Sequence, residues 1–484
     1  MQKGFVRRFI KDTALTSIGT ATSVALQFLS IVLLSRHLSK ESLGLYFLVL
    51  ATAHVLTVVS GLGLDLTQVR YLSTADDKRK VPVFGNIVFS RFVFAGILAF
   101  LLTLWGKSFL LIIDRRVAEI HLFVAAIFVL GSLRNLFYHT LQGFRLFPQF
   151  TGIKIGSALL RMILIIWIIA THKATIVHVL YIEMVVPACA ILVILYYVPF
   201  HRLSFTLNDR EQWAGLFRFC TPIYFNNIFM VIIERTNVLL MGILLNLQEV
   251  AIYEVAGKIS EGFLRIFRAF IVVYFPNLSK LFATYNREDA KTFLNQTLGF
   301  LSAGISFLVF GVFLFRKPII VLMFSEAYVN AALPLSLMMF NFHLRAMSNI
   351  LGYSIVSAGQ SSIPVRANIV ASAVLVVGSL LLIPRFGVIG AIISSFFMNI
   401  TTQIVYIYFL GKAMLKVNVF DYVKPMMCVV FLCGLYLFVG WDEPALRALF
   451  FILYIGLSWL YVHHWQILVK NVLNESFQII GVRR

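Results

Sequence analysis

The sequence predicts an all-α polytopic membrane protein with about 14 transmembrane helices, two six-helix lobes and two additional C-terminal helices. Three observations favour this fold class. Of the 484 residues, 60% are hydrophobic and only 13% are charged, whereas soluble domains carry about 25% charged residues. The apolar residues gather in runs of about 20, the length of a helix that crosses a bilayer. The connections between the runs are short, which confines any function to the membrane and its two surfaces.

Each predicted helix is one such apolar run. The first follows a basic N-terminal stretch, as in a signal peptide, but its apolar run is longer than a signal sequence needs, so it is predicted to be a transmembrane helix. The fourteen predicted spans are 13–36, 43–66, 83–105, 117–140, 151–171, 175–199, 217–245, 250–276, 294–315, 329–357, 364–383, 387–411, 423–440 and 445–466.

The distribution of Lys and Arg predicts the orientation. Of the 41 basic residues, 23 lie on the side of both chain ends, 10 lie in the opposite loops and 8 lie inside predicted spans. Because loops rich in Lys and Arg remain cytoplasmic, both termini are predicted to be cytoplasmic. Nucleic-acid binding would need basic residues gathered on a solvated surface, so the net charge of +20 does not indicate it.

A weak internal repeat sets the predicted domain organisation. A shift of 207 residues aligns Leu43-Gly44-Leu45-Tyr46 with Val250-Ala251-Ile252-Tyr253, each at the junction between two long spans. This alignment superposes helices one and two on helices seven and eight. It predicts an N-terminal lobe at 1–210, a C-terminal lobe at 211–412, and two further helices with a cytoplasmic tail at 413–484.

The eighth predicted span is the most unusual segment of the chain. Its charged residues follow one another at spacings of four, three, four and three, which places them within an arc of about 80° on one helix face. We call this set the charged stripe: Glu254, Lys258, Glu261, Arg265 and Arg268. An ionised side chain at the bilayer centre costs roughly 2.5 to 3.5 kcal/mol, so the stripe is predicted to face protein or water.

Two interpretations of the charged stripe remain open. Glu254 with Lys258 and Glu261 with Arg265 have the favourable acid-before-base order of i,i+4 pairs, so the stripe is either a self-neutralised ladder or part of a hydrated cationic cavity. These two pairs leave Arg268 without an acidic residue in the stripe, which favours binding of an anionic partner by the stripe. The aligned positions of the second span carry no charge; they are Phe47, Ala51, His54, Val58 and Gly61. This difference indicates that the charged stripe has a function beyond helix packing.

Other intramembrane charges complete the set of candidates. The residues predicted to bind an anionic group are Lys258, Arg265, Arg268, Arg91, Arg161 and Arg345. The acids predicted to balance charge or to couple to an ion are Glu254, Glu261, Glu234 and Asp65. Asp65 and Glu183 are the candidates for a coupling-ion or proton site, and Glu234 is expected to pair with Arg235. Catalytic and metal sites are not predicted, because His and Cys lack ligand spacing and no Walker, GxSxG or HExxH motif occurs. We therefore predict neither an enzyme nor a cofactor.

Four segments resemble a known family, in that family's order. They are LLSRHLSKESLGLYFLVLATAHVLTVVSGLGLDLTQVRYLS (33–73), FPNLSKL (275–281), RKPIIVLMFSEAYVNAALPL (316–335) and LLIPRFGVIGAIISSFF (381–397). They are similar to the polysaccharide-biosynthesis (Wzx-type) flippases of the multidrug/oligosaccharidyl-lipid/polysaccharide (MOP) exporter superfamily. The resemblance implies two lobes around a central cavity and flipping of an undecaprenyl-pyrophosphate-linked oligosaccharide across a bacterial or archaeal cytoplasmic membrane.

The resemblance also implies the partners and the nature of the site. The cationic residues would hold the pyrophosphate of a lipid-linked oligosaccharide, a proton or sodium ion would supply the coupling, and membrane lipid and other glycan-assembly proteins would be neighbours. Three alternatives remain open: a lipid II flippase, a cation/drug antiporter of the same superfamily, and a membrane glycan polymerase or ligase. The surplus of basic residues argues against the antiporter, and the lack of a large outer loop with convergent His, Arg or Asp residues argues against the polymerase.

Overall fold

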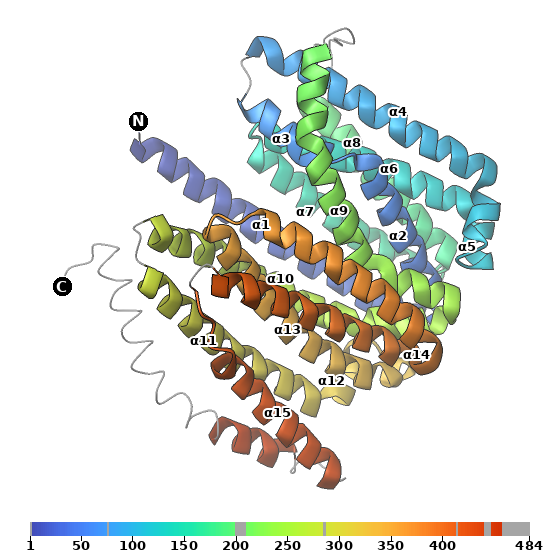
Figure 1. Ribbon diagram of the computed structural model, residues 1–484. Helices are drawn as coiled ribbons and strands as arrows, with labels where there is room; N and C mark the ends of the chain where they lie inside the picture. The colour runs from blue at the N-terminus through green and yellow to red at the C-terminus, as the bar shows by residue number, and fades with distance from the viewer. Residues whose placement is uncertain are drawn as a thin grey trace. The chain divides into compact units, whose positions relative to one another are not determined.

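The computed structural model describes residues 2–74, 77–198, 210–283, 287–412, 415–439 and 447–456, and within these ranges it is helical, with no strand (Figure 1). The elements of the first half are α1 (Gln2–His37), α2 (Lys40–Gly61), α3 (Leu64–Thr74), α4 (Asp77–Leu110), α5 (Arg115–Glu119), α6 (His121–Gly143), α7 (Phe147–Ala170), α8 (Ile176–Tyr197) and α9 (Arg210–Leu244). Those of the second half are α10 (Leu247–Ala283), α11 (Arg287–Leu314), α12 (Arg316–Met323), η2 (Glu326–Ala331), α13 (Ala332–Ser357), α14 (Ser362–Lys412) and α15 (Val419–Val439), followed by a short helix at Arg447–Gly456.

The all-helical polytopic prediction is confirmed, and several of the predicted spans differ in their bounds or in their continuity. The predicted span 43–66 ends earlier, because Leu62 adopts a left-handed conformation (φ 49°) and a new helix, α3, follows. The predicted spans 364–383 and 387–411 form one element, α14, which is kinked where Gly387 leaves helical geometry (φ 57°, ψ −135°). Only glycine adopts such a backbone conformation readily. The last predicted span, 445–466, lies partly outside the described residues.

In the described part of the chain, ten helices are long and apolar enough to cross a membrane. Helix α10 is not among them, although its 37 residues exceed the length that a crossing requires. Its charged stripe places five ionisable side chains within fifteen consecutive residues. The short elements α12 and η2, between α11 and α13, were not predicted, because neither has the length of a spanning run.

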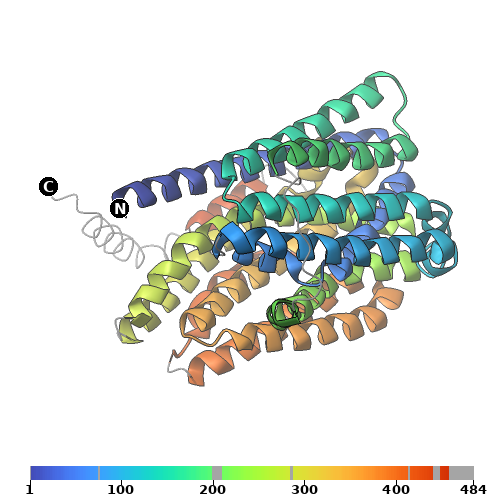
Figure 2. The same cartoon turned by 90° about the horizontal axis from the view of Figure 1, so that it is seen from above.

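The chain divides into two compact units. Unit 1 comprises Met1–Lys258, Met323–Ala331 and Asn368–Met398, and unit 2 comprises Ile259–Leu322, Ala332–Ala367 and Asn399–Arg484. Within unit 1, α1 packs lengthwise against α7, and α4 packs against α6 (Figures 1 and 2). The lobes predicted from the sequence repeat remain a prediction.

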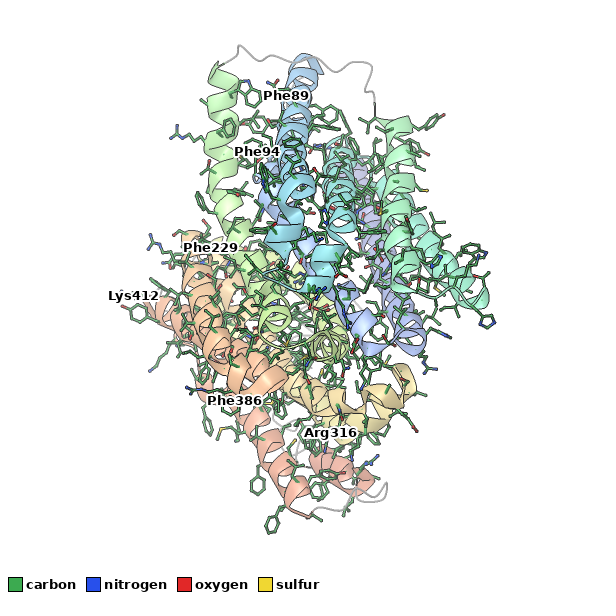
Figure 3. All side chains as sticks on the ribbon, turned by 90° about the vertical axis from the view of Figure 1, so that its right-hand side faces the viewer. Phe89, Phe94, Phe229, Arg316, Phe386 and Lys412 are labelled. Carbon is green, nitrogen blue, oxygen red and sulfur yellow. The ribbon has the colours of Figure 1, made fainter. Side chains whose placement is uncertain are left out.

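Large apolar side chains project outward from the helices of unit 1. Phe89 and Phe94 on α4 are 42% and 41% exposed, and Phe386 on α14 is 55% exposed (Figure 3). Soluble proteins rarely carry extended apolar surfaces, whereas a helix that contacts lipid requires one. These helices therefore present apolar side chains suited to contact with the hydrocarbon core of a membrane.

The beginnings of α2 and α10 meet within unit 1. Gln248 Nε2 donates to Glu41 Oε1 (3.1 Å), and these two residues are 207 positions apart, the shift of the sequence repeat. Arg116 Nη1 donates to the other carboxylate oxygen of Glu41 (2.7 Å), and this hydrogen bond raises the pKa of the Arg116 guanidinium. The backbones approach so closely that a Cβ on Gly44 would lie 1.8 Å from the carbonyl oxygen of Leu247. The two aligned junctions are thus in direct contact.

Replacing Gly44 by alanine should force this contact apart. A Cβ at that distance must displace backbone, and overpacking of this kind costs typically 1 to 3 kcal/mol. We expect a lower midpoint of thermal unfolding for G44A in detergent or nanodiscs. The matched control is G96A on α4, where an added Cβ meets nothing within 4 Å. Equal unfolding midpoints for the two variants would contradict the close approach.

Candidate anion-binding site

The first half of the charged stripe is neutralised within unit 1. Lys258 Nζ lies 2.5 Å from Glu254 Oε2, and both side chains are largely buried, at 16% and 7% exposure. The Lys258 ammonium also lies over the ring of Phe47, 5.1 Å from its centroid, within the range of a cation–π interaction. The expected Glu254–Lys258 pair is therefore formed.

The second half of the stripe, in unit 2, is different. Arg265 and Arg268 are both exposed, and neither forms an ion pair with any residue that the structure describes. Glu261 is half-buried and has interactions of its own, so the expected pairing of Glu261 with Arg265 is not formed within the described ranges. Two guanidinium groups on one face of a long membrane helix thus lack a carboxylate partner there.

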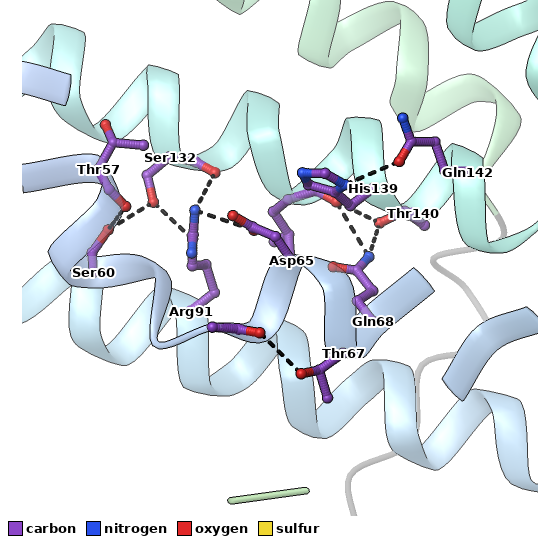
Figure 4. Close-up of polar contacts among 12 residues, drawn as sticks. Thr57, Ser60, Asp65, Thr67, Gln68, Arg91, Ser132, His139, Thr140 and Gln142 are labelled. Carbon is purple, nitrogen blue, oxygen red and sulfur yellow. Dashed lines mark hydrogen bonds and ion pairs between the residues drawn. The ribbon is translucent and has the colours of Figure 1, made fainter. Parts of the chain in front are cut away.

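Arg91 on α4 is fully buried among unit 1 helices (Figure 4). Its Nε donates to Ser132 Oγ (2.9 Å), and its Nη2 lies 3.6 Å from Asp65 Oδ1. Ser132 is also within hydrogen-bonding distance of Ser60 on α2 (3.2 Å). Arg91 and Asp65 were predicted to serve in anion binding and in coupling respectively, and the structure brings them together. Their pairing supplies the charge balance that a buried guanidinium needs.

Arg161 on α7 lies in a second closed cluster. Its Nε donates to Glu183 Oε1 of α8 (2.7 Å), its Nη2 donates to the Tyr46 hydroxyl of α2, and Tyr46 donates to the same Glu183 oxygen (2.9 Å). The side chains of Arg161 and Glu183 are 11% and 16% exposed. Sequence reasoning did not pair Arg161 with Glu183, because the two residues lie on different helices and share no helical spacing. Three helices are joined by this cluster.

The expected pair of Glu234 with Arg235 is not formed among the described residues. Glu234 is exposed, whereas Nη2 of the adjacent Arg235 lies 3.4 Å from His54 Nδ1 on α2. Successive helical residues point about 100° apart, which explains why neighbours in sequence do not meet. Arg345 on α13 is half-buried and has interaction partners in the structure.

Metal binding finds no support in the described residues. No group of three or more His, Cys, Asp or Glu side chains there is arranged to hold an ion. None of the four cysteines, all of which lie in the described ranges, forms a disulfide.

Comparison with known proteins identifies the family. The sequence profile of polysaccharide biosynthesis proteins matches residues 9–282, more than half of the chain. The chain belongs to this family. An uncharacterized membrane protein of Methanocaldococcus jannaschii is 23% identical over 409 residues, which cover 79% of this chain and 80% of that protein.

Solved structures agree with the family assignment at the level of fold. The lipid II flippase MurJ in an inward closed conformation matches with a TM-score of 0.73 and 13% identity, covering 93% of this chain and 99% of MurJ. An inward-facing multidrug resistance transporter of the MATE family, in the MOP superfamily, matches with a TM-score of 0.63 and 15% identity, covering 81% and 94%. The family match confirms the resemblance to polysaccharide-biosynthesis proteins found in the sequence, and the fold is similar to those of MurJ and of this MATE-family transporter.

The Tyr46–Arg161–Glu183 cluster yields a test of stability. Removing Glu183 leaves the guanidinium of Arg161 buried without its carboxylate, and breaking such a pair costs about 3 to 5 kcal/mol. We expect E183A to lower the midpoint of thermal unfolding strongly. E119A is the control, because the Glu119–Arg115 pair is exposed (56% and 85%) and contributes little. The double variant R161L/E183L should recover most of the loss, and a stable E183A would contradict the role of the pair.

Proposed function

We propose that this protein flips an undecaprenyl-pyrophosphate-linked oligosaccharide from the cytoplasmic to the periplasmic or outer leaflet. The observation that carries the proposal is the pair Arg265 and Arg268, exposed on α10 and without a carboxylate partner among the described residues. In a polysaccharide biosynthesis protein, the anion that such residues would meet is the pyrophosphate that links glycan to lipid. Planar guanidinium forks match phosphate oxygens in two-point hydrogen bonds.

The chemistry of this cargo explains why a protein is needed. The pyrophosphate and the sugars cannot enter hydrocarbon, whereas the polyprenyl tail can remain in it. A transporter must therefore shield the head group while the tail stays in lipid, and it must open alternately to the two sides of the membrane. Both termini are proposed to be cytoplasmic. A proton or sodium gradient or the membrane potential is proposed as the energy source, because the sequence has no nucleotide-binding motif.

The contacts suggest different roles for the candidate residues. Arg265 and Arg268 would bind the pyrophosphate, with Lys258 beside them on α10 held by Glu254. Arg91 and Arg161 have carboxylate partners inside unit 1, which suits a role in holding helices together. Glu254 and Glu261 are proposed to limit the positive charge of the stripe and to take part in coupling.

A lipid II flippase is the second candidate function. The fold similarity to MurJ, which extends over 93% of this chain, favours it, and lipid II also carries a polyprenyl pyrophosphate. At 13% identity this similarity extends to the fold alone, whereas the family match concerns polysaccharide biosynthesis. Flipping assays in proteoliposomes with both lipids would separate the two functions.

Export in cells tests the proposal directly. In a strain that lacks this gene, R265A/R268A should fail to restore glycan export, with a loss of about tenfold or more, because hydrogen bonds to charged groups are worth roughly 1.5 to 3 kcal/mol each. Lipid-linked repeat units should accumulate in the cytoplasmic leaflet. R115A is the control, because Arg115 is 85% exposed and lies outside the spanning helices. Normal export by R265A/R268A, at normal protein abundance, would refute the proposal.

A further inference from the structure

One face of α2 occupies the positions that align with the charged stripe of α10. The 207-residue shift places Phe47, His54 and Gly61 opposite Glu254, Glu261 and Arg268. This face carries no formal charge in the sequence. Basic groups nevertheless reach it from other helices of unit 1.

Three contacts bring cations to this α2 face. Lys258 of α10 lies over the Phe47 ring, and Nη2 of Arg235, on α9, lies 3.4 Å from His54 Nδ1. Arg91 of α4 reaches Gly61 so closely that a Cβ there would lie 2.7 Å from its Nη1. Arg134 lies on α6, which packs against α2. Cationic side chains of other helices therefore contact this face of α2, although its own residues carry no charge.

The cations on this face differ in how they are balanced. Lys258 is paired with Glu254, and Arg91 is paired with Asp65. Arg134 and Arg235 form no ion pair with any described residue, and the Nε atom of each is buried without a hydrogen-bond acceptor in the described structure. A buried donor without an acceptor costs about 1 to 3 kcal/mol. The charge of both guanidinium groups and one buried N–H of each therefore lack a partner in the described structure. Arg91 Nη1 is also a buried donor without an acceptor there, but Arg91 has the carboxylate of Asp65 beside it.

The hydrogen bond to His54 adds a third donor. A guanidinium group can only donate, so His54 Nδ1 accepts from Arg235, and the neutral ring carries its proton on Nε2. This N–H is available to an acceptor. Two guanidinium groups and one imidazole N–H, from three helices of the same unit, match an acceptor with several oxygens and a double negative charge.

We propose that His54, Arg134 and Arg235 form a second anion subsite, in unit 1, that binds the pyrophosphate of the lipid-linked cargo. This inference rests on the proposed function and names residues of α2, α6 and α9 within unit 1. A purely structural role for the two arginines is disfavoured by comparison within the same unit. Arg91 and Arg161 each have a carboxylate on a neighbouring helix, and Arg134 and Arg235 have none among the described residues.

The subsite makes an unusual prediction about stability. Removing an arginine that holds helices together through a carboxylate destabilises the fold, whereas removing one of two unbalanced cations relieves repulsion. R134Q and R235Q should therefore be at least as stable as wild type without ligand. Thermal unfolding of the full chain in nanodiscs measures this, and lower midpoints for both variants would assign the arginines to the scaffold and overturn the inference.

Binding to the full-length protein in nanodiscs then tests the ligand, with undecaprenyl pyrophosphate and inorganic pyrophosphate as separate probes. Wild type should bind the lipid, and R134Q and R235Q should each bind about tenfold more weakly, as expected from the loss of hydrogen bonds to a charged group. R115Q, at an exposed arginine outside the spanning helices, is the matched control and should bind like wild type. If inorganic pyrophosphate competes with the lipid for wild type but not for R134Q, the phosphate groups are the part of the lipid that the subsite recognises.

The outcomes separate this inference from the proposed function. If wild type binds the lipid and R134Q and R235Q bind it equally well, the subsite is wrong and the proposed function stands. If wild type binds neither probe, the proposed function fails and the subsite fails with it. Binding of inorganic pyrophosphate without the lipid would overturn the assignment to lipid-linked cargo.

Discussion

The cost of placing a guanidinium or ammonium group inside a membrane protein determines how each basic residue in the spanning helices is used. Such a group needs a carboxylate, other oxygen acceptors or water, since burial alone costs several kcal/mol per ion. Arg91 meets this need with Asp65 and Ser132, and Arg161 meets it with Glu183 and Tyr46. These clusters join helices that are far apart in sequence. The arginines that lack a carboxylate partner among the described residues are therefore the candidates for binding an anionic ligand.

Helix α10 contains both kinds of cation on one face. Glu254 and Lys258 are one turn apart, buried and paired, so this half of the charged stripe forms part of the packing of unit 1. Arg265 and Arg268 are exposed in the following turns of the same helix. The neutralised ladder therefore describes the start of the stripe, and Arg265 and Arg268 at its end form no ion pair with a described residue.

Helical spans could be predicted from the sequence because their signal is local. The length of an apolar run and its period are properties of consecutive residues, and the segments that became α4, α7 and α11 follow directly from them. The i,i+4 pair of Glu254 with Lys258 is local in the same sense. The pairing of Arg91 with Asp65, or of Arg161 with Glu183, depends on which helices pack together, and a single sequence does not encode that in any spacing. The expected pair of Glu234 with Arg235 failed because adjacency along a helix is not proximity of side chains.

The second span shows how tertiary contacts change the meaning of a sequence comparison. Its face with Phe47, His54 and Gly61 has no charge, and the alignment with α10 therefore suggested that the charged stripe has no counterpart in the first half of the chain. The structure brings Lys258, Arg235 and Arg91 to that same face from three other helices. Aligned helices in a repeat can thus reach a similar electrostatic environment by different routes, one through residues of the helix itself and the other through residues of its neighbours. The chemistry of such a site belongs to the surface that the helices build together, so an uncharged helix face is not evidence that the site lacks charge.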